Sequence, residues 1–150
     1  MVTVEISGKL PSGITEGLVN KLAYFSVKLT KFRRKSGVSI SLVGDAEIRR
    51  LNKRWRGIDR VTDVLSFNYR DESGFAAAAA GRPGQLGDIV ISLPQVRRQA
   101  KAIGRPASQE LALMIVHGLL HLLGCDHATR REEEGMFGLQ QEVLMRSGVL

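Results

Sequence analysis

Residues 111–123, LALMIVHGLLHLL, constrain the fold of this chain more than any other segment. As a helix, this segment is apolar nearly all round, and such a helix is stable only where other elements cover it on every side. We therefore expect it to be the buried central helix. Ser108 is placed to cap its N-terminus, Glu110 lies in a first turn where the helix dipole favours an acid, and Gly124 is placed to end it.

The remaining patterns predict the layers that cover this helix. Apolar and polar residues alternate in four segments that we predict as strands, at 2–7, 38–43, 61–67 and 86–92. Helical spacing of apolar residues predicts helices at 15–34, at 46–54 with Asp45 as its cap, at 93–103 and at 130–146. Residues 71–85 hold five consecutive alanines and are predicted to form a flexible loop. The sequence predicts one α+β domain over residues 1–150, a four-stranded mixed sheet with about five helices packed on it.

Charge and cysteine content narrow the class of protein. The chain has 22 Lys and Arg against 15 acidic residues, a net charge of +7 that favours encounter with polyanions such as nucleic acid. A single cysteine, Cys125, excludes an internal disulfide and fits a reducing compartment. The N-terminus lacks the pattern of a signal peptide, and the longest apolar run, Leu111 to Val116, is shorter than the ~20 residues of a membrane span. We expect a soluble, cytoplasmic protein with no membrane partner.

The three histidines of the chain all lie in HGLLHLLGCDH, at 117, 121 and 127. On a helix, His117 and His121 project side by side, as two ligands of one metal ion do. His127 can join them only if the chain turns back, and Gly124 permits such a turn. Three imidazoles leave one coordination position open, as in a catalytic zinc site. The sequence predicts one Zn²⁺ per chain, although three imidazoles also suit nickel, copper or iron. Cys125 is interpreted as a small apolar filler, and Asp126 as an acceptor that orients a ligand imidazole.

The spacing H-x3-H-x2-G-x2-H is that of the metzincin metalloproteases, so the helix of residues 108–124 is metzincin-like. Those enzymes carry a Glu directly after the first histidine as general base, and this chain has Gly118 there. A glycine cannot accept a proton, which disfavours a peptidase.

Several segments together resemble the YbeY family of bacterial metalloendoribonucleases, which act in ribosomal RNA maturation. HGLLHLLGCDH resembles the family signature HGxLHLxGYDH, with Cys125 in place of the usual Tyr. LNKRWR at 51–56 and TDVLSF at 62–67 match a second block, with Trp55 for Tyr and with Val61 for the usual Pro. LGDI at 86–89 and the positions of Met136, Phe137, Gln140 and Gln141 in the last helix also fit the family.

The resemblance implies a zinc-dependent endoribonuclease that prefers single strands and processes the 3′ end of small-subunit rRNA, with a part in ribosome quality control. Its implied partners are rRNA, the small ribosomal subunit and ribosome-associated proteins. Arg56 matches the functional arginine of the family, and its planar guanidinium suits a bidentate grip on phosphate. Nearby Lys53, Arg54 and Arg60 would then follow the RNA backbone without reading sequence. The attacking group stays open between a metal-activated water and the RNA's own 2′-hydroxyl.

Two alternatives remain at this stage. The first is a ribosome-assembly factor in which the metal only fixes the loop that carries His127. In such a factor Arg56→Ala would leave ribosome association nearly intact. The second is a peptidase-like hydrolase, which casein cleavage would reveal.

Overall fold

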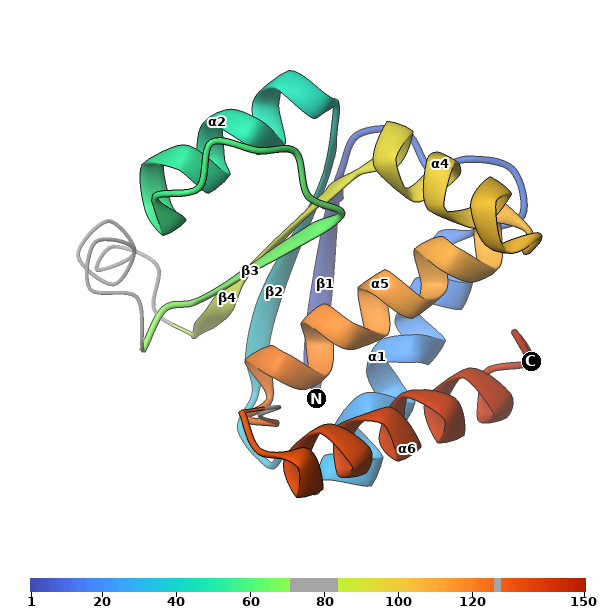
Figure 1. The fold of residues 1–150 in the computed structure, drawn as a ribbon. Coiled ribbons are helices and arrows are strands. Elements are labelled where there is room, and N and C mark those ends of the chain that lie inside the picture. The colour runs from blue at the N-terminus through green and yellow to red at the C-terminus, as the bar shows by residue number, and fades with distance from the viewer. Residues whose placement is uncertain (71–83, 126–127) are drawn as a thin grey trace.

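The computed structural model describes residues 1–70, 84–125 and 128–150, and these form one sheet flanked by helices (Figure 1). The strands are β1 (Val2–Ser7), β2 (Ser36–Val43), β3 (Val64–Asn68) and β4 (Gln85–Ser92). Among the described residues, the helices are α1 (Glu16–Thr30), α2 (Asp45–Arg56), α4 (Leu93–Ile103), α5 (Ala107–Leu122) and α6 (Arg130–Arg146). The predicted α+β class, with four strands and five helices, is confirmed.

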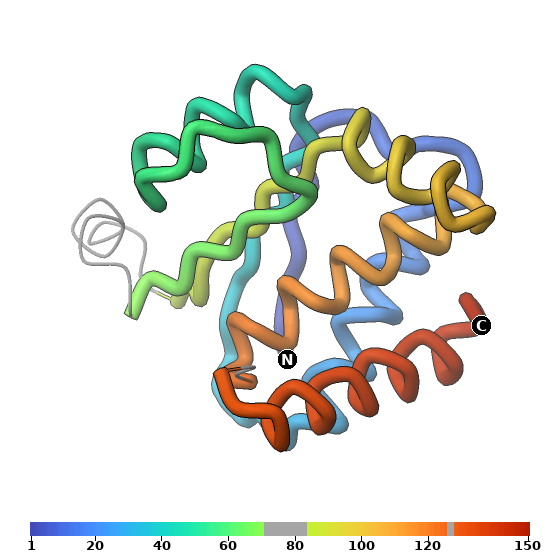
Figure 2. The backbone as a smooth tube through the Cα atoms, in the orientation of Figure 1, coloured from blue at the N-terminus to red at the C-terminus, as the bar shows by residue number. Residues whose placement is uncertain are grey.

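The sheet has the strand order β1-β2-β4-β3. β1 pairs with β2 and β2 with β4 in parallel, whereas β3 runs antiparallel to β4, so the sheet is mixed as predicted. β3 is therefore an edge strand. Among the described strands, it pairs with β4 alone. The trace in Figure 2 shows how the chain passes from α2 into this edge strand.

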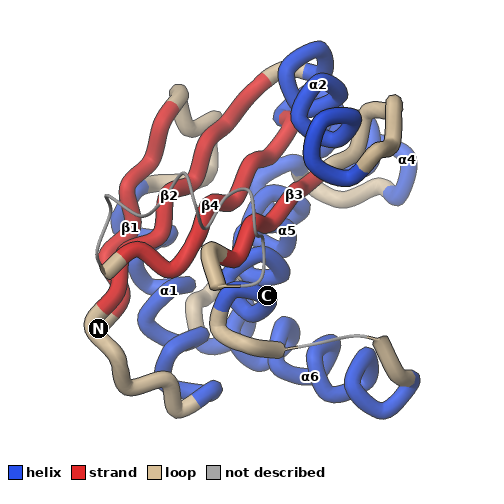
Figure 3. The backbone as a smooth tube through the Cα atoms, turned by 90° about the vertical axis from the view of Figure 1, so that its left-hand side faces the viewer, coloured by secondary structure: helices blue, strands red, loops and turns tan. Residues whose placement is uncertain are grey.

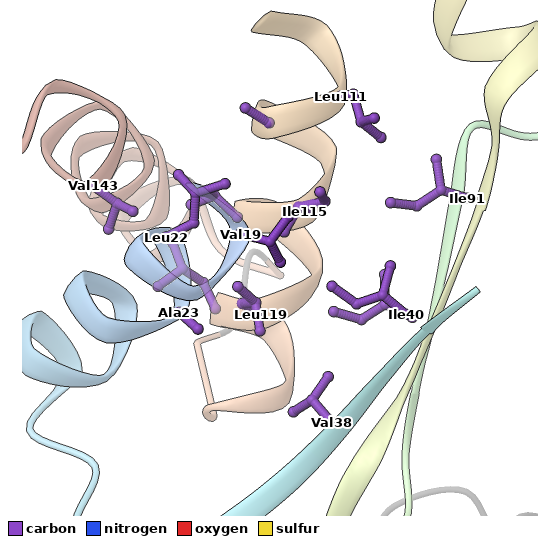
Figure 4. Close-up of a cluster of buried hydrophobic side chains, with 14 of the residues drawn as sticks. Val19, Leu22, Ala23, Val38, Ile40, Ile91, Leu111, Ile115, Leu119 and Val143 are labelled. Atoms are coloured by element: carbon purple, nitrogen blue, oxygen red, sulfur yellow. The ribbon is translucent and has the colours of Figure 1, made fainter. Parts of the chain in front are cut away.

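α5 lies at the centre of the larger core, as its apolar sequence predicts. Leu111, Ile115 and Leu119 are fully or almost fully buried between α1 and the sheet (Figure 4). α1 and α6 contribute Val19, Leu22 and Val143 from the side away from the strands. A helix covered in this way is held rigidly, so its partly exposed side chains, His117 and His121 among them, are presented in fixed positions.

α2 packs on the opposite face of the sheet, where a smaller cluster joins Ile48 of α2 to Leu65, Phe67 and Val90. Figure 3 shows α2 and α5 on the two sides of the strands. The strand period of two explains this division, because alternate residues of β3 and β4 face different helices. The C-terminal end of α2 is thereby brought beside the edge strand β3.

Two predicted helix ends are wrong for identifiable reasons. The helix that we predict at 15–34 ends at Thr30, because Lys31 adopts a left-handed conformation with φ 58° and closes it. Asp45 does not cap α2: Gly44 is the N-cap residue, and Asp45 lies inside the first turn. Its carboxylate instead accepts hydrogen bonds from Arg98 and Ser92, which hold the pKa of Asp45 below its usual value and tie α2 to α4.

Smaller corrections concern α5 and the strands. α5 begins one residue before Ser108, with Pro106 as its N-cap residue, while Glu110 lies in the first turn as predicted. β2 begins at Ser36, earlier than predicted, and β3 is shifted to Val64–Asn68. The predicted loop at 71–85 extends one residue too far at its C-terminal end, because Gln85 is already in β4. Residues 71–83 of this prediction lie outside the described residues. Within the described part of the chain, no helix has the length and apolar character that crossing a membrane requires.

Candidate metal centre and RNA-cleavage site

Arg56, His117 and His121 line one pocket, although they are far apart in the sequence. The pocket has a volume of about 150 Å³, and Val64, Leu65 and Ser66 of β3 complete its described wall. It lies where the C-terminal end of α2, the edge strand β3 and the last turns of α5 meet. The structure thus brings together two of the three predicted metal ligands and the predicted functional arginine.

α5 sets the positions of the two histidines. Residues four apart on a helix differ by about 40° in direction and by about 6 Å along the axis, so the imidazoles of His117 and His121 lie on one face. Both are half-buried, whereas Val116, Leu119 and Leu120 between and beside them are buried in the core. The packing of their neighbours therefore fixes the helix surface from which they project.

The end of α5 follows the prediction for Gly124. The helix stops at Leu122, and Gly124 has φ +101°, a conformation that favours glycine. The Cys125 N–H donates to the carbonyl of Leu120 at 2.9 Å, so the chain turns away from the helix axis at once. Asp126 and His127 lie outside the described residues, and their assigned roles stay predictions.

Arg56 is the last residue of α2 and reaches the edge of the sheet. Its Nη2 donates to the carbonyl oxygen of Ser66 at 2.8 Å. Its guanidinium carbon lies 4.9 Å from the centroid of the Phe67 ring, which is fully buried. A hydrogen bond and a cation–π contact together restrict a side chain that would otherwise be free to move. The positive charge is consequently held at the pocket that the two imidazoles line.

The segment TDVLSF contains the start of β3, the strand whose Ser66 carbonyl accepts the hydrogen bond from Arg56. The carboxylate of Asp63 accepts a hydrogen bond from the N–H of Val64 at 2.7 Å and from the amide of Gln99 at 3.2 Å. Its backbone carbonyl accepts from Ser92 N–H at 2.9 Å. Asp63 therefore fixes the start of β3, and with it the position of the Ser66 carbonyl.

Gln140 is a site residue whose role the sequence did not reveal. It projects from α6 with 8% of its surface exposed, and its Nε2 lies 2.9 Å from Nδ1 of His117. The sequence offers two signals, the fit of Gln140 to the family's last helix and a polar residue on the inward side of α6, between Met136 and Val143. Because α6 is amphipathic, the second signal marks a buried polar group that requires a partner, but not which partner.

Gly118 packs against the sheet and points away from the pocket. A Cβ at this position would come within 2.9 Å of two side-chain carbons of Ile89 on β4. This is the position of the metzincin general base, so this fold has no room there for a glutamate. The structure adds a steric reason to the chemical one that disfavours a peptidase.

Gly118→Ala is expected to destabilise the protein by about 1–3 kcal/mol, because the added methyl group overpacks the contact between α5 and β4. Urea unfolding measures this difference. Gly138→Ala is the matched control: this glycine is exposed in α6 and a Cβ there would meet nothing within 4 Å. The control should gain about 0.5–1 kcal/mol from helix propensity, and equal effects at the two positions would contradict the steric account.

The other predicted residues surround this pocket to different degrees. Lys53, Arg54 and Arg60 are exposed near the end of α2, and the Arg54 guanidinium lies 5.2 Å from the Trp55 ring centroid. Cys125 is half-buried against the main core, consistent with its interpretation as an apolar filler, and burial raises the pKa of its thiol. No three His, Cys, Asp or Glu side chains form a metal-binding group within the described residues, which exclude His127.

A second and wider hollow opens on the other side of His117. Its volume is about 860 Å³, and its lining includes Gln140, Phe137 and the carboxylates Glu133 and Glu134 of α6. His117 therefore stands between the small pocket that contains Arg56 and a larger open hollow.

Comparisons with known proteins agree with this architecture. The family model described as Endoribonuclease YbeY matches residues 6–148. A relative from Shouchella clausii named Endoribonuclease YbeY is 41% identical, with 99% of this chain and 97% of the relative covered. One from Geobacillus kaustophilus with the same name is 45% identical over 75% of this chain and 73% of its own length.

A solved structure has the same fold. The solution structure of TM1509 from Thermotoga maritima matches with a TM-score of 0.65 and 26% identity, covering 98% of this chain and 89% of that one. The family match at residues 6–148 includes the pocket residues and most of the sheet and helices. The chain therefore belongs to the Endoribonuclease YbeY family.

Proposed function

We propose that this protein is a metal-dependent endoribonuclease that cleaves single-stranded RNA in the maturation of small-subunit rRNA, at its 3′ end, and in ribosome quality control. The observation that carries the proposal is the joint lining of one pocket by His117, His121 and Arg56. The names of the relatives support the substrate class, and the net charge of +7 supports a polyanionic partner.

The donor chemistry of the pocket fits Zn²⁺. Two imidazoles one helical turn apart line the same pocket, and the chain leaves the helix axis at Gly124, as a third ligand at His127 would require. Because Gln140 contacts Nδ1 of His117, Nε2 is the nitrogen of this ring that would bind the metal. A bound zinc ion would supply Lewis acidity toward a phosphoryl oxygen and would lower the pKa of a coordinated water.

The chain's own residues supply the rest of the chemistry. The Arg56 guanidinium lies at the pocket and carries a permanent charge, so it can bind the phosphate and stabilise the negative charge that grows on it during cleavage. Its hydrogen bond to Ser66 keeps that charge oriented before substrate arrives. Lys53, Arg54 and Arg60 would bind neighbouring phosphates on the same side of the molecule.

Internal cleavage is the direct test of this function. Purified protein should cut a single-stranded RNA labelled at both ends into two labelled fragments, and should cut the same sequence much more slowly as a duplex. Fragments that shorten only from one end, or no cleavage of either RNA, would refute an endoribonuclease. The end groups decide the attacking group, because a 2′,3′-cyclic phosphate indicates attack by the RNA's own 2′-hydroxyl and would exclude attack by water.

Gln140→Ala is expected to weaken zinc binding by about 10- to 100-fold, because His117 loses the partner that orients its ring. A metal-bound imidazole carries its proton on Nδ1, so the Gln140 amide would turn by half a rotation to present its oxygen. Gln140→Glu should restore much of the affinity, since a carboxylate also accepts this proton. A competition titration with a chromogenic chelator measures the effect, and Gln141→Ala is the matched control. Unchanged zinc affinity in Gln140→Ala would contradict the role of this residue.

A further inference from the structure

Most of the net positive charge of the chain comes from one segment. Residues 17–44 contain six Lys and Arg and no acidic residue, leaving 16 basic against 15 acidic residues in the rest of the chain. Nearly the whole excess of positive charge therefore belongs to α1 and to the turn that joins it to β2. This segment is separate from the pocket and from the basic residues at the end of α2.

The structure places these cations on one exposed surface. Lys21, Tyr24, Lys28 and Lys31 follow one another at helical spacing on the outer side of α1, over roughly 15 Å at the usual rise per residue. The opposite side of α1 is buried in the core. The exposed side chains at 33–35 continue the row beyond the helix. We call this surface the α1 basic face: Lys21, Tyr24, Lys28, Lys31, Arg33, Arg34 and Lys35.

Basic residues elsewhere are often neutralised by carboxylates. Arg49 pairs with Asp59 at 2.8 Å, and Arg50 pairs with Glu47 at 2.7 Å. Among the described residues, no cation of the α1 basic face has a carboxylate within ion-pair distance. The face therefore keeps its full charge for an external anion.

An exposed aromatic ring lies within the row of cations. Tyr24 is 59% exposed, and the Lys28 ammonium lies 5.9 Å from its ring centroid. Phe25 meets the ring edge-on at a centroid distance of 5.1 Å, which restricts its orientation. Beside Tyr24 is a hollow of about 650 Å³ between α1 and the start of β1, with Val2 and Val27 in its lining. This provides space and an apolar surface for a flat ring.

We propose that the α1 basic face binds single-stranded RNA, with its cations on successive phosphates and one base stacked on Tyr24. Cations along a backbone track combined with an exposed aromatic ring are the two elements of single-strand binding. Charge alone would serve an acidic protein or an anionic lipid surface equally well; the accessible ring beside a hollow favours RNA. The inference rests on the proposed ribonuclease function. The C-terminal end of α1 lies toward the same end of the molecule as the C-terminal end of α5 (Figure 1), so RNA held at that end can extend toward the pocket.

Fluorescence anisotropy with a labelled single-stranded RNA tests the charges. The double variant Arg33→Gln/Arg34→Gln should bind about tenfold more weakly, and its slope of log affinity against log salt should fall by about 1.4, for two lost phosphate contacts. Arg97→Gln/Lys101→Gln is the matched control, because it removes two exposed charges from α4. The RNA is checked for integrity after each titration. Equal losses in the two double variants would show an effect of net charge alone and would overturn the proposal.

Tyr24 provides an independent test of the same face. Tyr24→Ala should weaken RNA binding by between about 5-fold and about 100-fold, and Tyr24→Phe, which keeps the ring, should bind as wild type does. Wild-type affinity in Tyr24→Ala would overturn the stacking role. Phosphatidylglycerol vesicles serve as the competing anion. If Arg33→Gln/Arg34→Gln weakens binding to these vesicles but leaves RNA binding unchanged, the face is assigned to lipid and the proposal is overturned.

The two proposals can fail separately. If wild-type protein cleaves RNA but the α1 variants bind RNA normally, only the RNA-binding role of the α1 basic face is wrong. If the α1 variants lose RNA binding as expected but wild-type protein cleaves no RNA, the ribonuclease proposal is wrong and the face remains an RNA-binding surface.

Discussion

Arg56→Ala is expected to reduce kcat/KM for RNA cleavage by about 10²- to 10³-fold, the effect of removing one preorganised charge from a transition state. Because Arg56 is held by the Ser66 carbonyl and the Phe67 ring, its charge is in place before the substrate binds. RNA affinity should change much less, since the substrate's other phosphates keep their own contacts. Single-turnover cleavage together with anisotropy separates the two quantities.

Arg56→Lys distinguishes charge from geometry. Lysine keeps the charge but lacks the planar fork that binds phosphate through two hydrogen bonds, so this variant should recover only part of the activity. Arg97→Ala on α4 is the control for loss of an exposed arginine. Normal cleavage by Arg56→Ala would contradict its catalytic role. Loss of cleavage with nearly intact ribosome association would separate an enzyme from an assembly factor that needs no catalysis.

His117→Ala is expected to lower RNA cleavage by roughly 10³-fold or more, because the loss of a metal ligand removes several kcal/mol of transition-state stabilisation. The protein should remain folded, since His117 is half-buried at a pocket and the core of α5 is made by Leu111, Ile115 and Leu119. Circular dichroism checks the fold, and elemental analysis should show that bound zinc is lost.

Chelation of the wild-type protein provides the matched control for this variant. Removal of zinc should reduce cleavage to the level of His117→Ala, and added zinc should restore cleavage in wild type but not in the variant. A variant that loses activity while it retains one zinc ion per chain would show that His117 acts in some other way. Unfolding of His117→Ala would instead assign the residue a structural role.

Much of the fold follows from patterns in the sequence. The apolar segment around Ile115 predicts a central helix, because burial on all sides requires a nearly continuous apolar run. Alternating residues predict the strands, because burial of one face leaves a period of two. The helix ends are less predictable. Lys31 closes α1 in a left-handed conformation that favours glycine, and Pro106 rather than Ser108 precedes α5. The positions of these two ends depend on where tertiary packing places the next element of the chain, and a local sequence pattern does not contain that information.

The site is predictable only where its residues are close in sequence. The spacing of His117 and His121 by one helical turn specifies their shared face directly. The position of Arg56 beside them depends on the way α2 packs across β3, and the resemblance to a known family, rather than spacing, identified this residue. The contact between Gln140 and His117 joins residues 23 positions apart on two helices. It depends on tertiary packing, and neither the family resemblance at Gln140 nor its place as a buried polar residue indicates its partner.

Zinc titration into metal-stripped wild-type protein, with RNA cleavage as the readout, tests the central claim most directly. We predict that cleavage is negligible without metal, rises with added zinc and saturates at one ion per chain, while His121→Ala stays inactive throughout. Full cleavage by metal-free wild type, or cleavage by His121→Ala equal to that of wild type, would contradict a metal-dependent ribonuclease site at this pocket.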